Sequence, residues 1–187
     1  AFGRRDELVV TFTGYSGSGY EDQDAFLRRA RSLLAEFDPE STIVNAGATE
    51  EGIGAVYELA REMGFETTGI VSSQALEADA AFSPFVDTIY VVADDRWGGR
   101  VEETGRLSPT SEAMVVVSDV VLAIGGGAVA RDELVAARDR GKEVRFFPAD
   151  LNHRRALERA ADRGEPAPTD FRGEVHSVFG EDPGGGR

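Results

Sequence analysis

The chain of 187 residues contains no cysteine and only one lysine, Lys142. The missing thiols exclude disulfide bonds, thiolate metal sites and a cysteine nucleophile. The two histidines, His153 and His176, lie far apart and do not have the spacing of a histidine metal site. We therefore predict no resident metal ligands. A chain without cysteine is compatible with the cytoplasm, where we expect the protein.

Long hydrophobic runs are also missing. No window approaches the roughly 18 apolar residues that cross a membrane, so no membrane partner is expected. The first residues, AFGRRDEL, lack the apolar stretch of a signal peptide. At 187 residues and 41% hydrophobic content, the chain is large enough for one domain with a substantial core.

Positive charge is scarce, and the formal net charge is −14. Such a field repels the phosphates of nucleic acids, so no nucleic-acid partner is expected. Almost every basic residue is arginine. A GC-rich genome and adaptation to high salt both account for this composition, and the sequence does not separate them.

Six short apolar or β-branched runs alternate with segments of helical periodicity. The predicted strands are residues 8–13, 42–44, 67–71, 87–93, 120–124 and 144–147. The predicted helices are residues 22–37, 51–63, 108–117 and 131–140, and residues 72–74 are predicted as a loop. A last helix is expected to run to residue 161 after a cap at Asp150 or Asn152. This alternation predicts an α/β fold, a single doubly wound Rossmann-like domain with a mainly parallel sheet of about six or seven strands.

We assign that domain to residues 1–162. Residues 163–187 are rich in glycine, proline and charge and are predicted as an irregular tail, disordered over residues 182–187. A few apolar residues of the tail are expected to dock on the body of the domain. They are Phe171, Val175, Val178 and Phe179.

The most informative stretch is VVLAIGGGAVARDEL, from Val120 to Leu134. A buried strand ends in three glycines, and a helix pattern follows at once. Glycine lets backbone approach a ligand closely, and the free N–H groups and dipole of a helix start attract anions. This pattern predicts an anion site that includes Gly125, Gly126, Gly127, Ala128 and Val129. A tight turn without a ligand is the structural alternative.

Other loops follow the carboxyl ends of the predicted strands, where ligands bind in such folds. Serine and backbone groups of the first loop are candidates for phosphate or ribose, Arg96 and Trp97 for a mobile lid, and His153 for a ligand contact or a helix cap. The second loop fits either ligand binding or turn chemistry. The remaining candidates of these two loops are Gly14, Tyr15, Ser16, Gly17, Ser18, Asn45, Gly47 and Thr49.

The chain resembles a Rossmann-like superfamily that includes lysine-decarboxylase-like phosphoribohydrolases (the LOG enzymes), molybdenum-cofactor carrier proteins and SLOG nucleotide-sensor domains. The resemblance is strongest over SDVVLAIGGGAVARDEL, residues 118–134. It continues in IVNAGATEEGIGAVYELA, residues 43–60, and more weakly in TGYSGSGYED, residues 13–22.

The hydrolases of this superfamily carry a PGGxGTxxE motif whose glutamate assists cleavage of an N-glycosidic bond. Glu133 matches that glutamate, but Gly125 replaces the proline, and Val129 and Ala130 replace Gly-Thr. Thr110, followed by Ser111, stands where the hydrolases place an arginine on the preceding helix. We expect Thr110 and Ser111 to line the ligand site.

These departures favour the carrier and sensor branches over the hydrolases. The resemblance thus implies a non-catalytic protein that binds a nucleotide or nucleotide-like phosphorylated cofactor, with or without Mg²⁺. The alternative is a phosphoribohydrolase that cleaves nucleoside 5′-monophosphates, with Glu133 as its catalytic acid. A homodimer formed through helices that flank the site is a further expectation from the resemblance.

Overall fold

Six parallel strands form one sheet in the order β4-β3-β2-β1-β5-β6 in the computed structural model, which describes residues 7–180. The predicted α/β class and parallel sheet are confirmed. The strands are β1 (Leu8–Gly14), β2 (Thr42–Ala46), β3 (Glu66–Ser72), β4 (Thr88–Val92), β5 (Val120–Ile124) and β6 (Glu143–Phe147).

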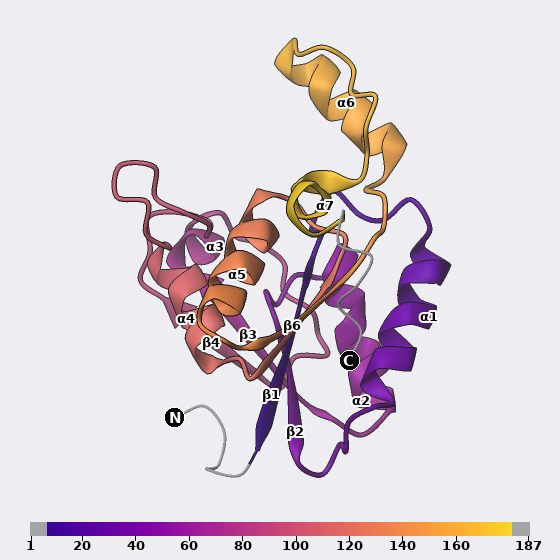
Figure 1. The fold of residues 1–187 in the computed structure, drawn as a ribbon, viewed down its shortest axis with the longest axis vertical. Coiled ribbons are helices and arrows are strands. Elements are labelled where there is room, and N and C mark those ends of the chain that lie inside the picture. The colour runs from indigo at the N-terminus through magenta and orange to yellow at the C-terminus, as the bar shows by residue number, and fades with distance from the viewer. Residues whose placement is uncertain (1–6, 181–187) are drawn as a thin grey trace.

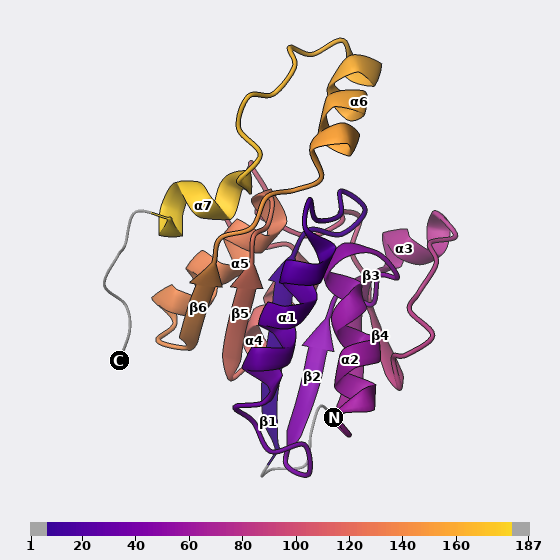
Figure 2. The same ribbon diagram turned by 90° about the vertical axis from the view of Figure 1, so that its right-hand side faces the viewer.

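The helices lie on both faces of this sheet. α1 (Gln23–Leu34) and α2 (Val56–Glu62) cover one face, and α4 (Pro109–Val117) and α5 (Ala128–Asp139) cover the other (Figures 1 and 2). The chain order of the strands reverses between β1 and β5. This reversal makes their carboxyl ends the topological switch point of the sheet, where such folds bind ligands.

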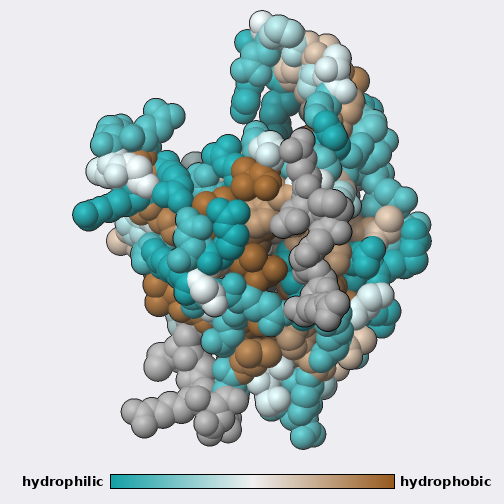
Figure 3. All heavy atoms as spheres, viewed as in Figure 1, coloured by the Kyte–Doolittle hydropathy of each residue, from teal (hydrophilic) through white to brown (hydrophobic). Residues whose placement is uncertain are grey.

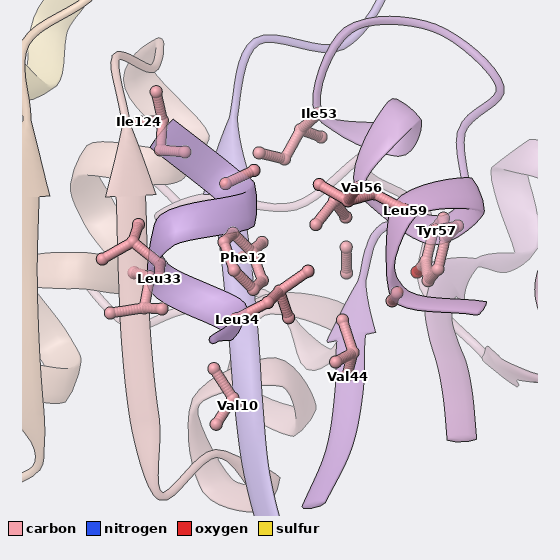
Figure 4. Close-up of a cluster of buried hydrophobic side chains, with 14 of the residues drawn as sticks. Val10, Phe12, Leu33, Leu34, Val44, Ile53, Val56, Tyr57, Leu59 and Ile124 are labelled. Carbon is pink, nitrogen blue, oxygen red and sulfur yellow. The ribbon is translucent and has the colours of Figure 1, made fainter. Parts of the chain in front are cut away.

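The core forms on both faces because strand residues alternate in direction. Along β5, Val120, Leu122 and Ile124 join the apolar cluster beneath α1 and α2. Figure 4 shows Ile124 in this cluster together with Val10, Phe12, Leu34 and Val56. Val121 and Ala123 join a second cluster with Leu134 of α5. Strand β5 is therefore buried on both sides, as its uninterrupted apolar sequence indicated.

Side-chain caps fix several helix starts. Asp22 accepts a hydrogen bond from the Ala25 N–H at 2.8 Å, and Asn152 accepts one from the Arg155 N–H at 3.0 Å. The latter begins α6 (His153–Arg163), which stands out from the body of the molecule in both ribbon views (Figures 1 and 2). Ser72 caps α3 (Ser73–Glu77) in the same way, so the prediction of a loop at residues 72–74 was wrong.

Two further elements differ from the expectation. The predicted helix over residues 51–63 divides into a short 3₁₀ helix, η1 (Gly52–Ala55), and α2. Helix α5 begins at Ala128, about one turn before the predicted residue 131. The prediction was late because the N-cap, Gly127, lacks the polar side chain by which an N-cap is recognised in a sequence.

The tail is not wholly irregular, since it contains α7 (Gly173–Phe179), whose Val175 is fully buried against the body. The disorder predicted for residues 182–187 lies outside the described residues. Hydrophilic residues cover most of the face seen in Figure 3, and hydrophobic residues gather over its middle, where α5 lies. Among residues 7–180, no helix combines the length and apolar character needed to span a membrane.

Candidate ligand site at the switch point

The switch point is formed by the loop after β1 and the glycine turn after β5. Gly14 at the end of β1 pairs with Ile124 at the end of β5, so the two loops leave the sheet side by side. Gly125 and Gly126 have φ angles of 57° and 128°, which favour glycine strongly. The turn therefore needs glycine for its shape, and it leads directly into α5, which begins at Ala128.

Two tyrosines of the first loop fill the space beside this turn. The Tyr20 hydroxyl donates to the Ile124 carbonyl at 2.7 Å, and the Tyr15 hydroxyl donates to the Ala149 carbonyl at 2.8 Å. Their rings meet edge to face with centroids 5.1 Å apart. A Cβ on Gly125 would lie 2.5 Å from the Tyr15 ring. Tyr15, predicted to contact a ligand, thus packs on the glycine turn itself.

Burial raises the pKa of the Tyr15 hydroxyl to about 12, and the carboxylates of Asp150, Glu174 and Asp170 add to the shift. The phenol therefore stays neutral at physiological pH. The surroundings of Tyr15 therefore include three carboxylates, of which Asp170 is paired with Arg172 at 2.6 Å.

The start of α5 is the part of the predicted anion site that remains open. Gly127 at the N-cap has no side chain to accept from the first N–H groups of the helix. Ala128 and Val129, the first two helical residues, are exposed. Gly125 and Gly126 are buried, so a ligand would meet the helix start rather than the strand end.

Glu133 lies on the inner side of α5, one turn further along, and is only 6% exposed. Its carboxyl accepts a hydrogen bond from the Ser111 hydroxyl at 2.7 Å and a longer one from the Thr13 hydroxyl at 3.5 Å. Burial raises its pKa to about 7, with a smaller contribution from the Asp132 charge. Glu133 thus connects β1, α4 and α5 and carries a proton in a substantial fraction of molecules at neutral pH.

The segment after β4 is fastened to the helix starts by backbone hydrogen bonds. The Asp94 carboxylate accepts from the Thr110 N–H at 2.9 Å and from the Arg96 N–H at 3.0 Å. Burial alone would raise the pKa of Asp94, but these hydrogen bonds lower it overall. Ser108 stands at the N-cap of α4 as predicted, yet Asp94 supplies the side-chain acceptor there.

Two more hydrogen bonds hold the same segment. The Gly99 N–H donates to the Ser111 hydroxyl at 2.8 Å, and the Arg100 N–H donates to the Asp132 carboxylate at 2.9 Å. Ser111 therefore accepts from the segment after β4 and donates to Glu133. Trp97 is 60% exposed, and the Arg96 side chain pairs with Glu103 at 3.2 Å.

Asn45, predicted as a ligand contact, lies in the core of the structure. It is fully buried between β1 and β3, where its Nδ2 donates to the Thr11 hydroxyl at 3.0 Å and its Oδ1 accepts from the Thr68 hydroxyl at 3.1 Å. Gly47 is exposed, and the Thr49 hydroxyl accepts from the Glu51 N–H at 3.3 Å. Both the Nδ2 and the Oδ1 of Asn45 are therefore hydrogen-bonded within the core.

The first loop is also engaged, by α6. The Arg155 guanidinium donates to the Gly17 carbonyl at 3.0 Å, and Arg159 donates to the Ser18 hydroxyl at 2.9 Å. Ser16 is exposed. A surface cavity of about 360 Å³ lies beside this contact and is lined by residues that include Gly19, Gly52, Asn152 and Arg155.

His153 begins α6 and packs on the tail. Its ring stacks on Phe171 with centroids 4.1 Å apart, and its Nε2 lies 3.0 Å from the Asp150 carboxylate. Its backbone N–H donates to Glu21 at 2.8 Å. These contacts give His153 a structural role at this edge. Among residues 7–180, no three histidine, aspartate or glutamate side chains cluster closely enough to hold a metal ion.

Sequence reasoning missed Thr13, Tyr20 and Asp132. Thr13 carried a weak signal, because it is a polar residue at the carboxyl end of an apolar strand. Tyr20 and Asp132 carried none, since only the packing of the loops brings them to the turn.

Comparison with known proteins places the fold. No protein-family model and no curated protein matches the chain. Among solved structures, the molybdenum cofactor carrier protein from Chlamydomonas reinhardtii aligns with a TM-score of 0.53 and 19% identity over 78% of this chain and 77% of that one. The structural-genomics protein TM1055 aligns with a TM-score of 0.51 and 24% identity over 73% and 72%. The chain shares the fold of these two proteins. The resemblance expected from the sequence is thus confirmed at the level of the fold.

Proposed function

We propose that the protein binds a nucleotide or nucleotide-like phosphorylated cofactor at the carboxyl edge of its sheet, as a carrier or sensor rather than as an enzyme. The observation that carries this proposal is the start of α5. This helix of 12 residues begins at the switch point, directly after a glycine turn, with no side-chain cap at Gly127. Free N–H groups and a helix dipole at that position suit a phosphate.

The position of Glu133 favours binding over hydrolysis. A catalytic acid has to reach the bond that it cleaves, whereas Glu133 is 6% exposed and accepts from Ser111 and Thr13. Thr110, where the hydrolases carry an arginine, is buried and gives its backbone N–H to Asp94. The structural neighbour described as a molybdenum cofactor carrier supports a carrier role.

The first test is a thermal-shift screen of the wild-type protein with AMP, ADP, ATP, GMP, NAD, ADP-ribose and a phosphorylated pterin, with and without Mg²⁺. A ligand at a hundredfold excess over its Kd stabilises the folded state by about 2.7 kcal/mol, which a thermal shift detects readily. Silence across the panel contradicts the proposal.

A matched pair of variants then locates the site. Val129→Glu places a carboxylate on the exposed first turn of α5, where it interacts favourably with the helix dipole and so preserves the fold. We expect it to weaken binding of the hit by at least about tenfold through repulsion of the phosphate. Val129→Gln has nearly the same shape without the charge, and it should bind within about twofold of wild type. Equal binding by both variants would move the site away from α5.

The second candidate function is cleavage of the N-glycosidic bond of a nucleoside 5′-monophosphate. The observation that favours it is the pKa of Glu133, about 7, which suits a general acid. Chromatography of each hit after incubation tests it directly. Release of free base by the wild type but not by Glu133→Gln would establish a hydrolase. Recovery of the ligand intact would support the carrier or sensor role.

A further inference from the structure

Helix α7 lies directly on the glycine turn. The Val175 N–H donates to the Gly126 carbonyl at 3.2 Å, and the Val175 side chain is fully buried. A Cβ on Gly126 would lie 2.8 Å from Val175 Cγ2. At the start of the helix, Gly173 has a φ of 74°, and a Cβ there would collide with the Gly126 carbonyl. The turn and α7 are shaped to fit each other.

Glu174 brings a carboxylate to the start of α5. Its Oε2 lies 3.5 Å from the position that a Cβ on Gly127 would take. Glu174 is otherwise exposed, so its side chain is free to leave. A negative oxygen therefore lies close to the N-cap of α5, near the place expected for a ligand phosphate, and it disfavours that phosphate by repulsion.

The remaining contacts of α7 are made mainly by half-buried rings, and the His176 ring meets the Phe146 ring edge to face with centroids 6.1 Å apart. The Phe179 ring contacts Phe146 at 6.3 Å between centroids and lies under the Arg138 guanidinium at 5.2 Å. Before the helix, the Leu151 N–H donates to the Phe171 carbonyl at 2.8 Å. A helix of seven residues with one buried side chain has little stability of its own. It joins α6 through an extended connection that is visible in Figure 2.

We propose that α7 is a displaceable cover of the ligand site, with the Glu174 carboxylate standing in for the anion of the ligand. In this arrangement the closed form shields the glycine turn in the free protein. Binding of a phosphate at α5 then expels Glu174 and releases α7 from Gly126. This inference rests on the proposed binding function, and the experiments below separate the failure of one from the failure of the other.

The first experiment weakens the cover. Gly173→Ala introduces a Cβ against the Gly126 carbonyl, whereas Gly164→Ala introduces one at a similar φ of 66° with no atom within 4 Å. The pair therefore shares the backbone strain and differs in the contact. We expect Gly173→Ala to bind AMP about tenfold more tightly than wild type, since a larger fraction of molecules is open. Gly164→Ala should match wild type, and equal affinity for all three proteins overturns the inference.

The second experiment removes the charge alone. Glu174→Gln keeps the packing of α7, and it should bind AMP several-fold more tightly with a reduced dependence on salt. Glu165→Gln, which removes the same charge from an exposed position between α6 and α7, is the control. Unchanged affinity in Glu174→Gln means that the carboxylate does not compete with the ligand.

Hydrogen exchange of the Val175 amide reports the position of the cover, because this N–H bonds to Gly126. Saturation of the wild type with AMP should speed its exchange, and slower or unchanged exchange with AMP bound would overturn the cover while the binding function stands. If AMP and the rest of the nucleotide panel bind neither wild type nor Gly173→Ala, both proposals fall.

Discussion

The Ser111 hydroxyl donates a hydrogen bond of 2.7 Å to Glu133 and accepts one of 2.8 Å from the Gly99 N–H. One hydroxyl group thus joins α4, α5 and the segment after β4 at the edge of the sheet. The Glu133 carboxyl that accepts this hydrogen bond is buried and has a pKa raised to about 7. The strength of the Ser111–Glu133 hydrogen bond therefore depends on pH near neutrality.

Stability should fall as the pH rises from about 4.5 to 7. The pKa of Glu133 is about 7 in the folded protein against a model value of 4.5, so over this range the native state holds a proton that the unfolded chain has lost. The free energy of unfolding then decreases by up to about 3 kcal/mol. Urea denaturation at several pH values measures it.

Glu133→Gln isolates this contribution, because a neutral amide accepts from Ser111 at every pH. We expect its stability relative to wild type to rise by the same amount over the same range. The exposed change Glu40→Gln should leave the wild-type profile in place. Parallel profiles for Glu133→Gln and wild type would mean that Glu133 ionises normally.

Asn45→Leu should destabilise the fold by about 2 kcal/mol, because the buried Thr68 hydroxyl loses its acceptor and the Thr11 hydroxyl keeps only Ser118 as a partner. Urea denaturation tests the change, and the substitution Gln23→Leu at an exposed position should cost less than about 0.5 kcal/mol. The folded variant should retain ligand affinity. Loss of ligand binding in a stably folded Asn45→Leu protein would mean that Asn45 contributes to the ligand site.

Asp94→Ala should lower stability by about 1–2 kcal/mol, the usual effect of removing a helix cap. The carboxylate accepts from Thr110 and Arg96, and its pKa is lowered in the folded state. Its contribution is therefore present above the ordinary aspartate pKa and lost as the pH falls below it. The control is Asp95→Ala, whose side chain is 93% exposed. Denaturation at pH 7 should separate the two variants, and the difference should shrink at pH 3.

Trp97 should emit as a water-exposed indole in the free protein, since it is 60% exposed and is the single tryptophan of the chain. Efficient quenching by acrylamide checks this. A ligand whose base stacks on Trp97 should reduce that quenching, as the lid interpretation of the sequence predicts. Unchanged quenching at saturation would remove Trp97 from the ligand contacts.

The strands could be predicted because each is a short apolar or β-branched run between turns, and β5, which is followed by three glycines, carried the clearest pattern. The first helical pattern was expected to begin at Asp22, which is the N-cap of α1 in the structure, and Asn152, the N-cap of α6, was one of two expected caps, with Asp150 as the other. The start of α5 was placed too late because its cap, Gly127, has no side chain. Helix α3 was missed because Ser72 suits both a turn and a helix cap.

Side-chain surroundings at the edge of the sheet were harder to predict. Asn45 follows a β-branched pair and looks like a turn residue, and only its pairing with Thr11 and Thr68 shows that it is buried. The burial of Glu133 depends on Ser111, which lies on another helix. Both effects arise from contacts between segments distant in sequence, which local patterns do not contain.

The pairing of β1 with β5 also sets an order for synthesis. Gly14 pairs with Ile124, so one side of the central strand has no neighbour until about 110 further residues have been made, roughly 5–20 s at ordinary rates of translation. During that interval β1 presents an edge of unpaired backbone N–H and C=O groups to other nascent chains. We expect the growing chain to rely most on chaperones before β5 leaves the ribosome.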